Sequence, residues 1–173
     1  MPLYALGEQV PDIHPDAYVH PDAVIIGSVT IGPESSVWPT AVLRGDDGLI
    51  VVGARTSIQD GTIVHTTPFT PTTIGDDCVI GHNVHLEGCT IEDGALVGSG
   101  SVVLHRAIVR TEALVGANAL VTNDTEVPSR AMALGVPAVI KEGRVDPEVM
   151  IKLGAASYVE RSKRYRTGLR RLD

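Results

Sequence analysis

Aromatic residues are scarce in this chain. Phe, Trp and Tyr make up 3% of its 173 residues, although hydrophobic residues of all kinds make up 43%. A chain of this length is one domain's worth and can bury a sizeable core. Because so few rings are available, that core must be built from Val, Ile, Leu and Ala, which favours thin, repetitive packing.

Cysteine and long apolar runs are also rare. Cys78 and Cys89 form neither a disulfide framework nor a CxxC pair, and both are interpreted as buried packing residues. The opening "MPLYALGEQV" lacks the basic start and apolar core of a signal peptide, and no run is long enough to cross a membrane. The expectation is a reduced cytoplasmic protein without a membrane partner.

Basic residues are few except near the end of the chain. The net charge is -7; residues 1–140 hold 16 acids against 5 bases, whereas residues 141–173 hold 9 bases against 5 acids. A basic tail can bind nucleic acid or an anionic membrane. The simpler interpretation is a basic helix lying on an acidic body, so no nucleic-acid partner is expected.

What the chain has in abundance is a six-residue repeat. From residue 91 it divides into IEDGAL, VGSGSV, VLHRAI, VRTEAL, VGANAL and VTNDTE, each with Ile or Val first and a small residue or Thr fifth. Strands alternate faces with period two, so a period of six requires turns between short flat segments. Such units cannot bury their faces alone and must stack as a solenoid, here of about 17 repeats.

This pattern resembles the hexapeptide repeat of left-handed parallel β-helices, in which three repeats make one triangular coil. The resemblance implies an all-β solenoid of left-handed coils, and the residues after the repeats predict a C-terminal α-helix. The expected divisions are an N-terminal lead-in over 1–18, a left-handed β-helix over 19–127, an irregular connection over 128–145 and a helix over 146–172.

The terminal helix is predicted from its start signal and its apolar stripe. Asp146 can cap free amides and Pro147 suits the first helical position. Spacings of four and three place one stripe on a single face, which packs on the coil or on a neighbouring subunit. The stripe comprises Ile151, Ala155, Tyr158, Ser162, Tyr165, Leu169 and Leu172.

Stacked repeats turn sequence positions into columns. Arg44, His65 and Glu87 occupy the same position of successive coils, so they are expected to form an outward ladder with strands about 4.8 Å apart. His65 and Glu87 can therefore supply two metal ligands from neighbouring coils. His82 lies at a corner, so the natural completion is His82 of an adjacent subunit.

Several ordered motifs are similar to the γ-class carbonic anhydrase family. They are VLRGD (42–46), SIQDGTIVH (57–65), IGHNVHLEGCTI (80–91), GVPA (135–138) and SYVERSKRY (157–165). The resemblance implies a homotrimer with metal sites at subunit interfaces, each built from three histidines, two of one chain and one of the next. His65 matches the first ligand and His82 the ligand from the neighbouring chain. Zn²⁺ is the expected metal, with Fe²⁺ or Co²⁺ as alternatives.

The same resemblance assigns roles to other residues. Arg44 and Asp46 match a pair that ties subunits together, and Gln59 and Asp60 match polar residues beside the site. Tyr158 is matched only through the terminal helix. Tyr158 either closes the pocket or has only a structural role in the packing of the helix.

The chain departs from the family at the third ligand, where Glu87 stands in place of a histidine. His85 is an alternative ligand, because His85 and Glu87 flank inward Leu86 and face the same way, roughly 6.6 Å apart. Glu87 is preferred because it occupies the column directly over His65.

The functional hypothesis is reversible hydration of CO₂ to bicarbonate at a metal held by His65, Glu87 and a neighbour's His82. An anionic ligand offsets part of the metal's charge, so activity is expected to be weak at neutral pH and to rise in alkali. Two alternatives stay open: a catalytically silent trimer that binds a metal or ligand, and a hexapeptide acyltransferase that uses an interfacial histidine as general base. His105, a coil above the site, is a candidate proton shuttle or a surface residue.

Overall fold

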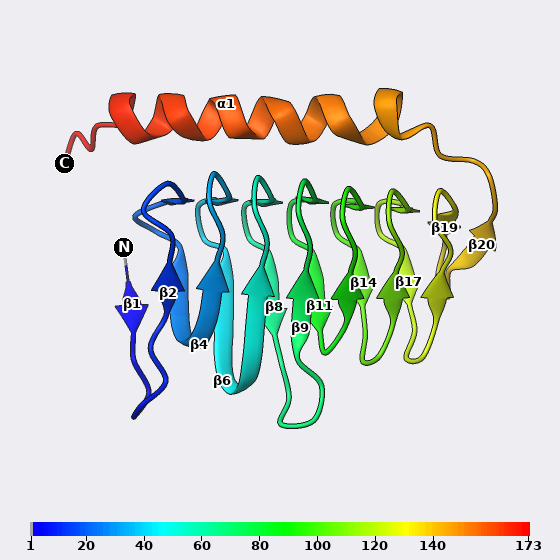
Figure 1. The fold of residues 1–173 in the computed structure, drawn as a ribbon, viewed down its shortest axis with the longest axis horizontal. Helices are drawn as coiled ribbons and strands as arrows, with labels where there is room; N and C mark the ends of the chain where they lie inside the picture. Colours follow the sequence, from blue (N-terminus) through cyan, green and yellow to red (C-terminus); the bar gives the residue numbers. More distant parts are fainter. Residues whose placement is uncertain (1) are drawn as a thin grey trace.

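The computed structural model describes residues 2–173, which form a left-handed parallel β-solenoid of about seven turns with one helix along its edge (Figure 1). Successive coils pair in parallel register, and the helix runs antiparallel to the growth of the solenoid, back toward the N-terminal coils. The predicted fold class is confirmed.

Short strands stack on three faces, and two long strands, β4 and β6, turn the corner between the first face and the second. The first face holds β1 (Leu3–Tyr4), the first parts of β4 (Val24–Ile31) and β6 (Val42–Val52), β8 (Ile63–His65), β11 (His85–Glu87), β14 (Val102–Val103) and β17 (Leu120–Val121). The second holds β2 (Asp12–Ile13), the later parts of β4 and β6, β9 (Thr72–Ile74), β12 (Thr90–Ile91), β15 (Ile108–Val109) and β18 (Glu126–Val127). The third holds β3 (Tyr18–Val19), β5 (Ser36–Val37), β7 (Ser57–Ile58), β10 (Val79–Ile80), β13 (Leu96–Val97), β16 (Leu114–Val115), β19 (Met132–Leu134) and β20 (Val139–Lys141).

The core follows the repeat as predicted. The first-position aliphatics Leu43, Val64 and Leu86 face one another in register and are fully buried. Small residues such as Ala95 fill the space near the corners, and Cys78 and Cys89 are buried there too. Each aliphatic removed from water contributes about 1.5–3 kcal/mol, so the stack itself is the main stabilising element.

Corner geometry explains the polar residues of each repeat. Asn83 and Asn118 adopt φ values of 55° and 56°, in the left-handed region that Asn tolerates. At Gly27 the backbone has φ of 75° and a Cβ atom there would lie 2.4 Å from the carbonyl oxygen of Gly45. Only glycine fits where the chain passes so close to the next coil.

The predicted boundaries of the β-helix, 19 and 127, are too narrow. Within the expected lead-in, β1 and β2 already pair with β4, and β3 pairs with β5. Within the expected irregular connection, β19 extends the third face by pairing with β16, and β20 then returns antiparallel. The six-residue pattern is weak in these terminal coils. Terminal strands stack against a neighbouring coil on one side only, so their sequences are less constrained.

The C-terminal helix begins as predicted and ends early. The Asp146 side chain accepts a hydrogen bond from the Glu148 amide at 3.1 Å. A π-helical turn η1 (Glu148–Lys152) comes next, and α1 (Leu153–Gly168) follows it. The predicted end at 172 is wrong: the chain becomes extended after Gly168, and Leu169 and Leu172 are 48% and 84% exposed. Glycine's low helix propensity accounts for the stop.

An aromatic cluster fixes the helix to the solenoid. Trp38 is 4% exposed, and its ring centroid lies 5.6, 5.5 and 5.1 Å from those of Tyr18, Tyr158 and Tyr165. Tyr158 and Tyr165 meet the indole edge-on and Tyr18 meets it at a tilt, and edge-to-face contacts suit aromatic packing. Most of the chain's few rings are therefore gathered at this one contact, and the helix packs on its own coil.

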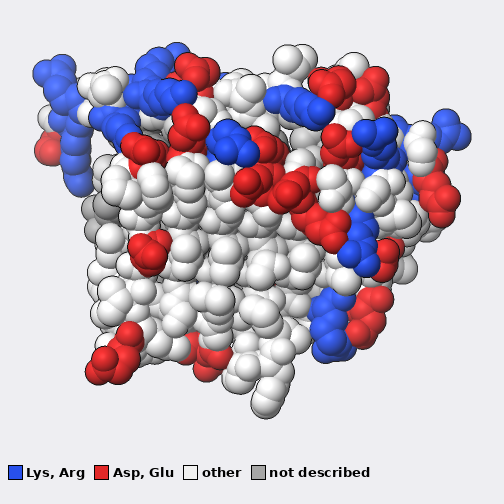
Figure 2. All heavy atoms as spheres, in the orientation of Figure 1, with Lys and Arg blue, Asp and Glu red and all other residues white. Residues whose placement is uncertain are grey.

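Charged side chains gather over the helix and along one end of the molecule, whereas the solenoid face seen in Figure 2 is largely uncharged. None of the helices in residues 2–173 combines the length and the apolar character that a membrane crossing requires.

Candidate functional site

The predicted ladder is present on the first face of the solenoid. Arg44 pairs in register with His65, and His65 with Glu87. His65 Nδ1 lies 3.1 Å from Glu87 Oε1, and the two side chains are only 15% and 24% exposed. Parallel register places these imidazole and carboxylate groups together although 22 residues separate them.

Asp46 lies on the other side of the His65 ring. His65 Nε2 is 3.3 Å from Asp46 Oδ1, while Arg44 donates to Asp46 Oδ2. A ligating histidine usually donates its second N–H to a carboxylate, which fixes its tautomer. A proton on Nε2 alone would direct the Nδ1 lone pair of His65 at the Glu87 oxygen, which is the state that metal ligation requires.

That arrangement fits a metal ion. In the metal-free chain the ionised Glu87 accepts a hydrogen bond from His65 Nδ1–H. Loss of that proton would leave two acceptors that face each other, which a cation satisfies. Two ligand atoms at Zn²⁺ bond lengths and a tetrahedral angle lie about 3.3 Å apart, close to the 3.1 Å seen here. One nitrogen and one oxygen are thus in place, and further ligands must come from elsewhere.

Both carboxylates of this group are ionised at neutral pH. Partial burial acts to raise the pKa of Glu87, but hydrogen bonds from His65 and His85 and the nearby His105 outweigh it, so the pKa lies below its ordinary value. Partial burial also acts to raise the pKa of Asp46. Hydrogen bonds from Arg44, the backbone and His65 outweigh it, so the pKa of Asp46 also lies below its ordinary value. Both groups are therefore negative in the folded chain at neutral pH.

His82 lies apart from this pair, on the corner that precedes the first face. Its Nδ1 is 2.9 Å from Asp60 Oδ2, and both side chains are nearly half exposed. Asp60 and His82 stack as predicted, with Gln59, 4% exposed, beside them. Strands rise about 3.3 Å per residue, so His82 cannot reach the metal position beside Glu87, five residues later in the chain.

Two groups of predicted site residues therefore occupy opposite edges of one face. Arg44, Asp46, His65 and Glu87 are together at one edge, and Gln59, Asp60 and His82 at the other. Within one chain they do not form a single site.

Tyr158 joins neither group directly. Its ring packs edge-on against Trp38, and the Arg161 guanidinium lies 4.7 Å from its centroid. Burial raises the pKa of Tyr158 above its ordinary value, with Arg161 opposing and Asp60 adding to the shift. The phenol is therefore neutral at neutral pH, and it packs between α1, which carries it, and Trp38 of the solenoid.

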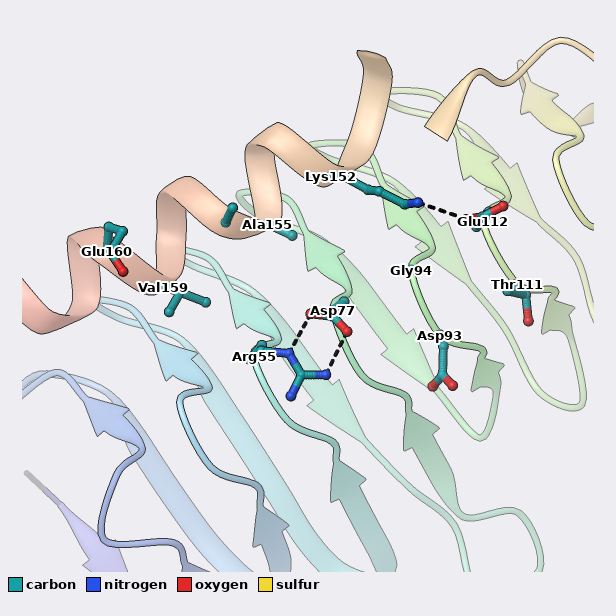
Figure 3. Close-up of a pocket in the computed structure, with 11 residues that line it drawn as sticks. Arg55, Asp77, Asp93, Gly94, Thr111, Glu112, Lys152, Ala155, Val159 and Glu160 are labelled. Carbon is teal, nitrogen blue, oxygen red and sulfur yellow. Dashed lines mark hydrogen bonds and ion pairs between the residues drawn. The ribbon is translucent and has the colours of Figure 1, made fainter. Parts of the chain in front are cut away.

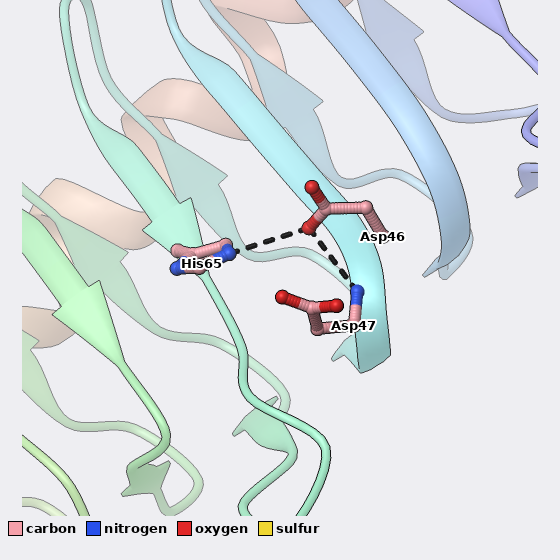
Figure 4. Close-up of side chains that lie close together, drawn as sticks. All are labelled: Asp46, Asp47 and His65. Carbon is pink, nitrogen blue, oxygen red and sulfur yellow. Dashed lines mark hydrogen bonds and ion pairs between the residues drawn. The ribbon is translucent and has the colours of Figure 1, made fainter.

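Asp47 was not anticipated from the sequence. Asp46, Asp47 and His65 bring ligand atoms within 4.8 Å of one another (Figure 4). The Asp46 carboxylate, however, already accepts from Arg44 and from the Asp47 amide. Its oxygens are committed to holding the loop and His65, which leaves the Nδ1 side of His65 as the metal-facing side. In the sequence, the only indication of a feature here is that the run RGDDGL (44–49) adds residues to a six-residue repeat.

His105 is the remaining histidine of this region. A Cβ atom added to Gly88 would lie 2.8 Å from His105 Nδ1, so the ring is packed against the turn that follows Glu87. Its place one coil beyond the ladder agrees with the sequence interpretation.

An apolar hollow lies elsewhere, between α1 and the corner that joins the second face to the third. It encloses about 510 Å³ and is roofed by Ala155, Ala156 and Val159 (Figure 3). Its charged rim is internally paired: Arg55 donates to both Asp77 oxygens at 2.7 Å, and Lys152 lies 3.6 Å from Glu112. No group of the ladder lines it.

Comparisons with known proteins agree with the hexapeptide-repeat solenoid described above. The hexapeptide-repeat family described as bacterial transferase hexapeptide (six repeats) matches residues 71–105. The chain is 39% identical over 159 residues to the mitochondrial γ carbonic anhydrase 2 of Arabidopsis thaliana, covering 88% of this chain and 57% of that protein. It is 37% identical over 170 residues to the carnitine operon protein CaiE of Salmonella agona, covering 98% and 86%.

Solved structures agree on the architecture. A hexapeptide transferase family protein from Anaplasma phagocytophilum superposes with a TM-score of 0.90 at 34% identity, covering 95% of this chain and 98% of that one. The chain spans little more than half the length of the plant relative, whereas it spans most of CaiE. On these similarities and on its hexapeptide solenoid, the chain belongs to the γ-carbonic anhydrase family of hexapeptide-repeat proteins.

Proposed function

We propose that the chain is a γ-carbonic anhydrase-like metalloenzyme that hydrates CO₂ reversibly to bicarbonate at a subunit interface. His65 and Glu87 of one chain and His82 of a neighbouring chain would hold Zn²⁺, with Fe²⁺ or Co²⁺ as alternatives. The observation that carries the proposal is the 3.1 Å approach of His65 Nδ1 to Glu87 Oε1. His82 lies at the opposite edge of the face, so a second copy is needed to complete the set, and the resemblance to γ-class carbonic anhydrases makes a homotrimer the proposed assembly.

When bound, the metal supplies Lewis acidity that makes a water nucleophilic near neutral pH. The chain's own residues do the positioning. Asp46 orients His65, and Arg44 holds Asp46 in turn. The Glu87 carboxylate adds a negative charge, which lowers the net charge at the site compared with three neutral histidines.

Gln59 and Asp60 accompany His82 at its corner, so they would enter the site from the same chain as His82. The Gln59 amide is suited to hydrogen-bond a bicarbonate oxygen, and Asp60 Oδ2 lies 2.9 Å from His82 Nδ1. Because Nδ1 of His82 faces this carboxylate, Nε2 would be the nitrogen that binds the metal.

Stopped-flow CO₂ hydration tests the proposal, measured on protein of known zinc content with His65→Ala as the control. The rate should be low at neutral pH and rise toward about pH 9, because the anionic ligand makes the water less acidic. A high rate that is flat from pH 6 to 9 would contradict the role given to Glu87. Stoichiometric zinc without any hydration would contradict the reaction.

A catalytically silent trimer is the second candidate. It is favoured by the other His65 tautomer, in which Nδ1–H donates directly to Glu87 and needs no cation. A metal-free protein whose stability is unchanged by chelators would support it. Acetyl-CoA turnover with an amine or alcohol acceptor would instead favour a hexapeptide acyltransferase.

A further inference from the structure

His85 is a polar exception in an aliphatic column. On the outer side of the first face, register places Val24, Val42, Ile63, His85, Val102 and Leu120 one above another. Five of these six residues are aliphatic, as a packed outer wall requires. The sole imidazole stands beside Glu87, the residue that departs from the family's three-histidine pattern.

The carboxylate of Glu87 is shared between two imidazole rings. Its Oε1 lies 3.1 Å from His65 Nδ1, and its Oε2 lies 3.2 Å from His85 Nε2. An ionised carboxylate only accepts hydrogen bonds, so the proton of this second contact is on His85 Nε2. His85 therefore holds one oxygen and leaves the other directed at His65.

We infer that His85 is a positioning residue: its Nε2–H fixes the Glu87 carboxylate so that Oε1 faces His65 and the metal. The inference rests on the proposed function for the metal, but the hydrogen bond itself does not. Glutamate has one more rotatable bond than a histidine ligand has, so a carboxylate at this position needs a second contact to stay in place.

The geometry disfavours His85 as a metal ligand. Among residues 2–173, ligand atoms of His65, Glu87 and His85 do not all fall within 4.8 Å of one another. The two rings bind different oxygens of the carboxylate, which stands between them. Direct ligation by His85 would require Glu87 to leave its present position.

Two substitutions separate positioning from ligation. His85→Gln keeps an N–H donor at similar reach, whereas His85→Val removes the donor and restores the aliphatic column. We expect His85→Val to weaken Zn²⁺ affinity about 10- to 100-fold, as loss of an outer partner does, and His85→Gln to stay near the native affinity. Competition with a chromophoric chelator measures the affinities.

The absorption spectrum of the Co²⁺-substituted trimer adds a second readout. Under the positioning role, the native protein and His85→Gln give the same four-coordinate spectrum. Equal loss of affinity in both variants, with a changed spectrum, would identify His85 as a ligand and overturn the inference. Unchanged affinity in His85→Val would overturn it as well.

A metal-free readout keeps this test distinct from that of the proposed function. Crystal structures of the metal-free native protein and of His85→Val should show Glu87 Oε1 near His65 Nδ1 in the first and turned away in the second. If the native protein binds no metal, the proposed function fails while these structures still decide the role of His85. A Glu87 side chain that keeps its place in His85→Val would refute that role.

Discussion

His65 and Glu87 face each other across adjacent parallel strands, with Nδ1 of the first 3.1 Å from Oε1 of the second. The solenoid creates this contact from residues one coil apart, and its rigidity keeps both side chains in one geometry. A site of this kind depends on register, because a shift of either strand by one residue would turn that strand's group to the other side of the wall.

Replacing Glu87 by histidine tests whether the carboxylate limits the reaction. Glu87→His restores a neutral third ligand, so zinc-normalised CO₂ hydration at pH 7 should rise by about tenfold or more. Glu87→Gln is the matched control, since it removes the charge without adding a ring and should bind zinc poorly. No gain in a fully zinc-loaded Glu87→His protein would show that the limitation lies elsewhere.

Acid should destabilise the metal-free protein through Glu87. The folded pKa of Glu87 lies below its ordinary value of 4.5, so its contribution to the free energy of unfolding is present above about pH 4.5 and is lost as the pH falls through the folded pKa. Thermal unfolding between about pH 7 and pH 3 measures this loss.

Other carboxylates, such as Glu92 beside Arg110, contribute in the same direction, because hydrogen bonding to Arg110 lowers the pKa of Glu92. Glu87→Gln should therefore flatten the acid limb only in part. The exposed Glu8→Gln is the control and should leave the curve unchanged. An acid limb of equal slope in native protein and Glu87→Gln would contradict the assignment.

Trp38 should determine whether α1 stays docked. The indole is buried against Tyr18, Tyr158 and Tyr165, so Trp38→Ala should cost about 3–5 kcal/mol of unfolding free energy. Hydrogen exchange should rise in α1 first, while the β10 and β13 coils stay protected. Chemical denaturation with Leu172→Ala as an exposed control gives the comparison, and equal stability of the two variants would show that the cluster does not fix the helix.

Much of the fold could be predicted because one physical rule repeats in every coil. Buried aliphatics at the first position, as at Val97 and Val115, identify the inward column and therefore the outward one. The ladder of Arg44, His65 and Glu87 followed directly from that register. The coils around β2 and β19 were missed because, near the ends, fewer neighbours constrain the sequence.

Other features needed three-dimensional detail. The paired contacts of Glu87 depend on side-chain rotamers, so the sequence offered His85 only as an alternative ligand. Asp46 approaches His65 because the long strand β6 continues beyond a six-residue repeat. The repeat pattern therefore does not predict this contact. α1 ends at Gly168, before the predicted end at 172. The prediction followed the apolar stripe past this glycine and therefore placed the end of the helix too late.

Subunit mixing tests the central claim most directly. His65→Ala and His82→Ala chains should each form trimers that bind little zinc. Mixed at random in equal amounts by co-refolding, they should regain about one quarter of the native zinc, because an interface is intact only where a chain with His65 meets a chain with His82. No recovery in verified mixed trimers, or full zinc binding by His82→Ala alone, would contradict a site shared between neighbouring chains.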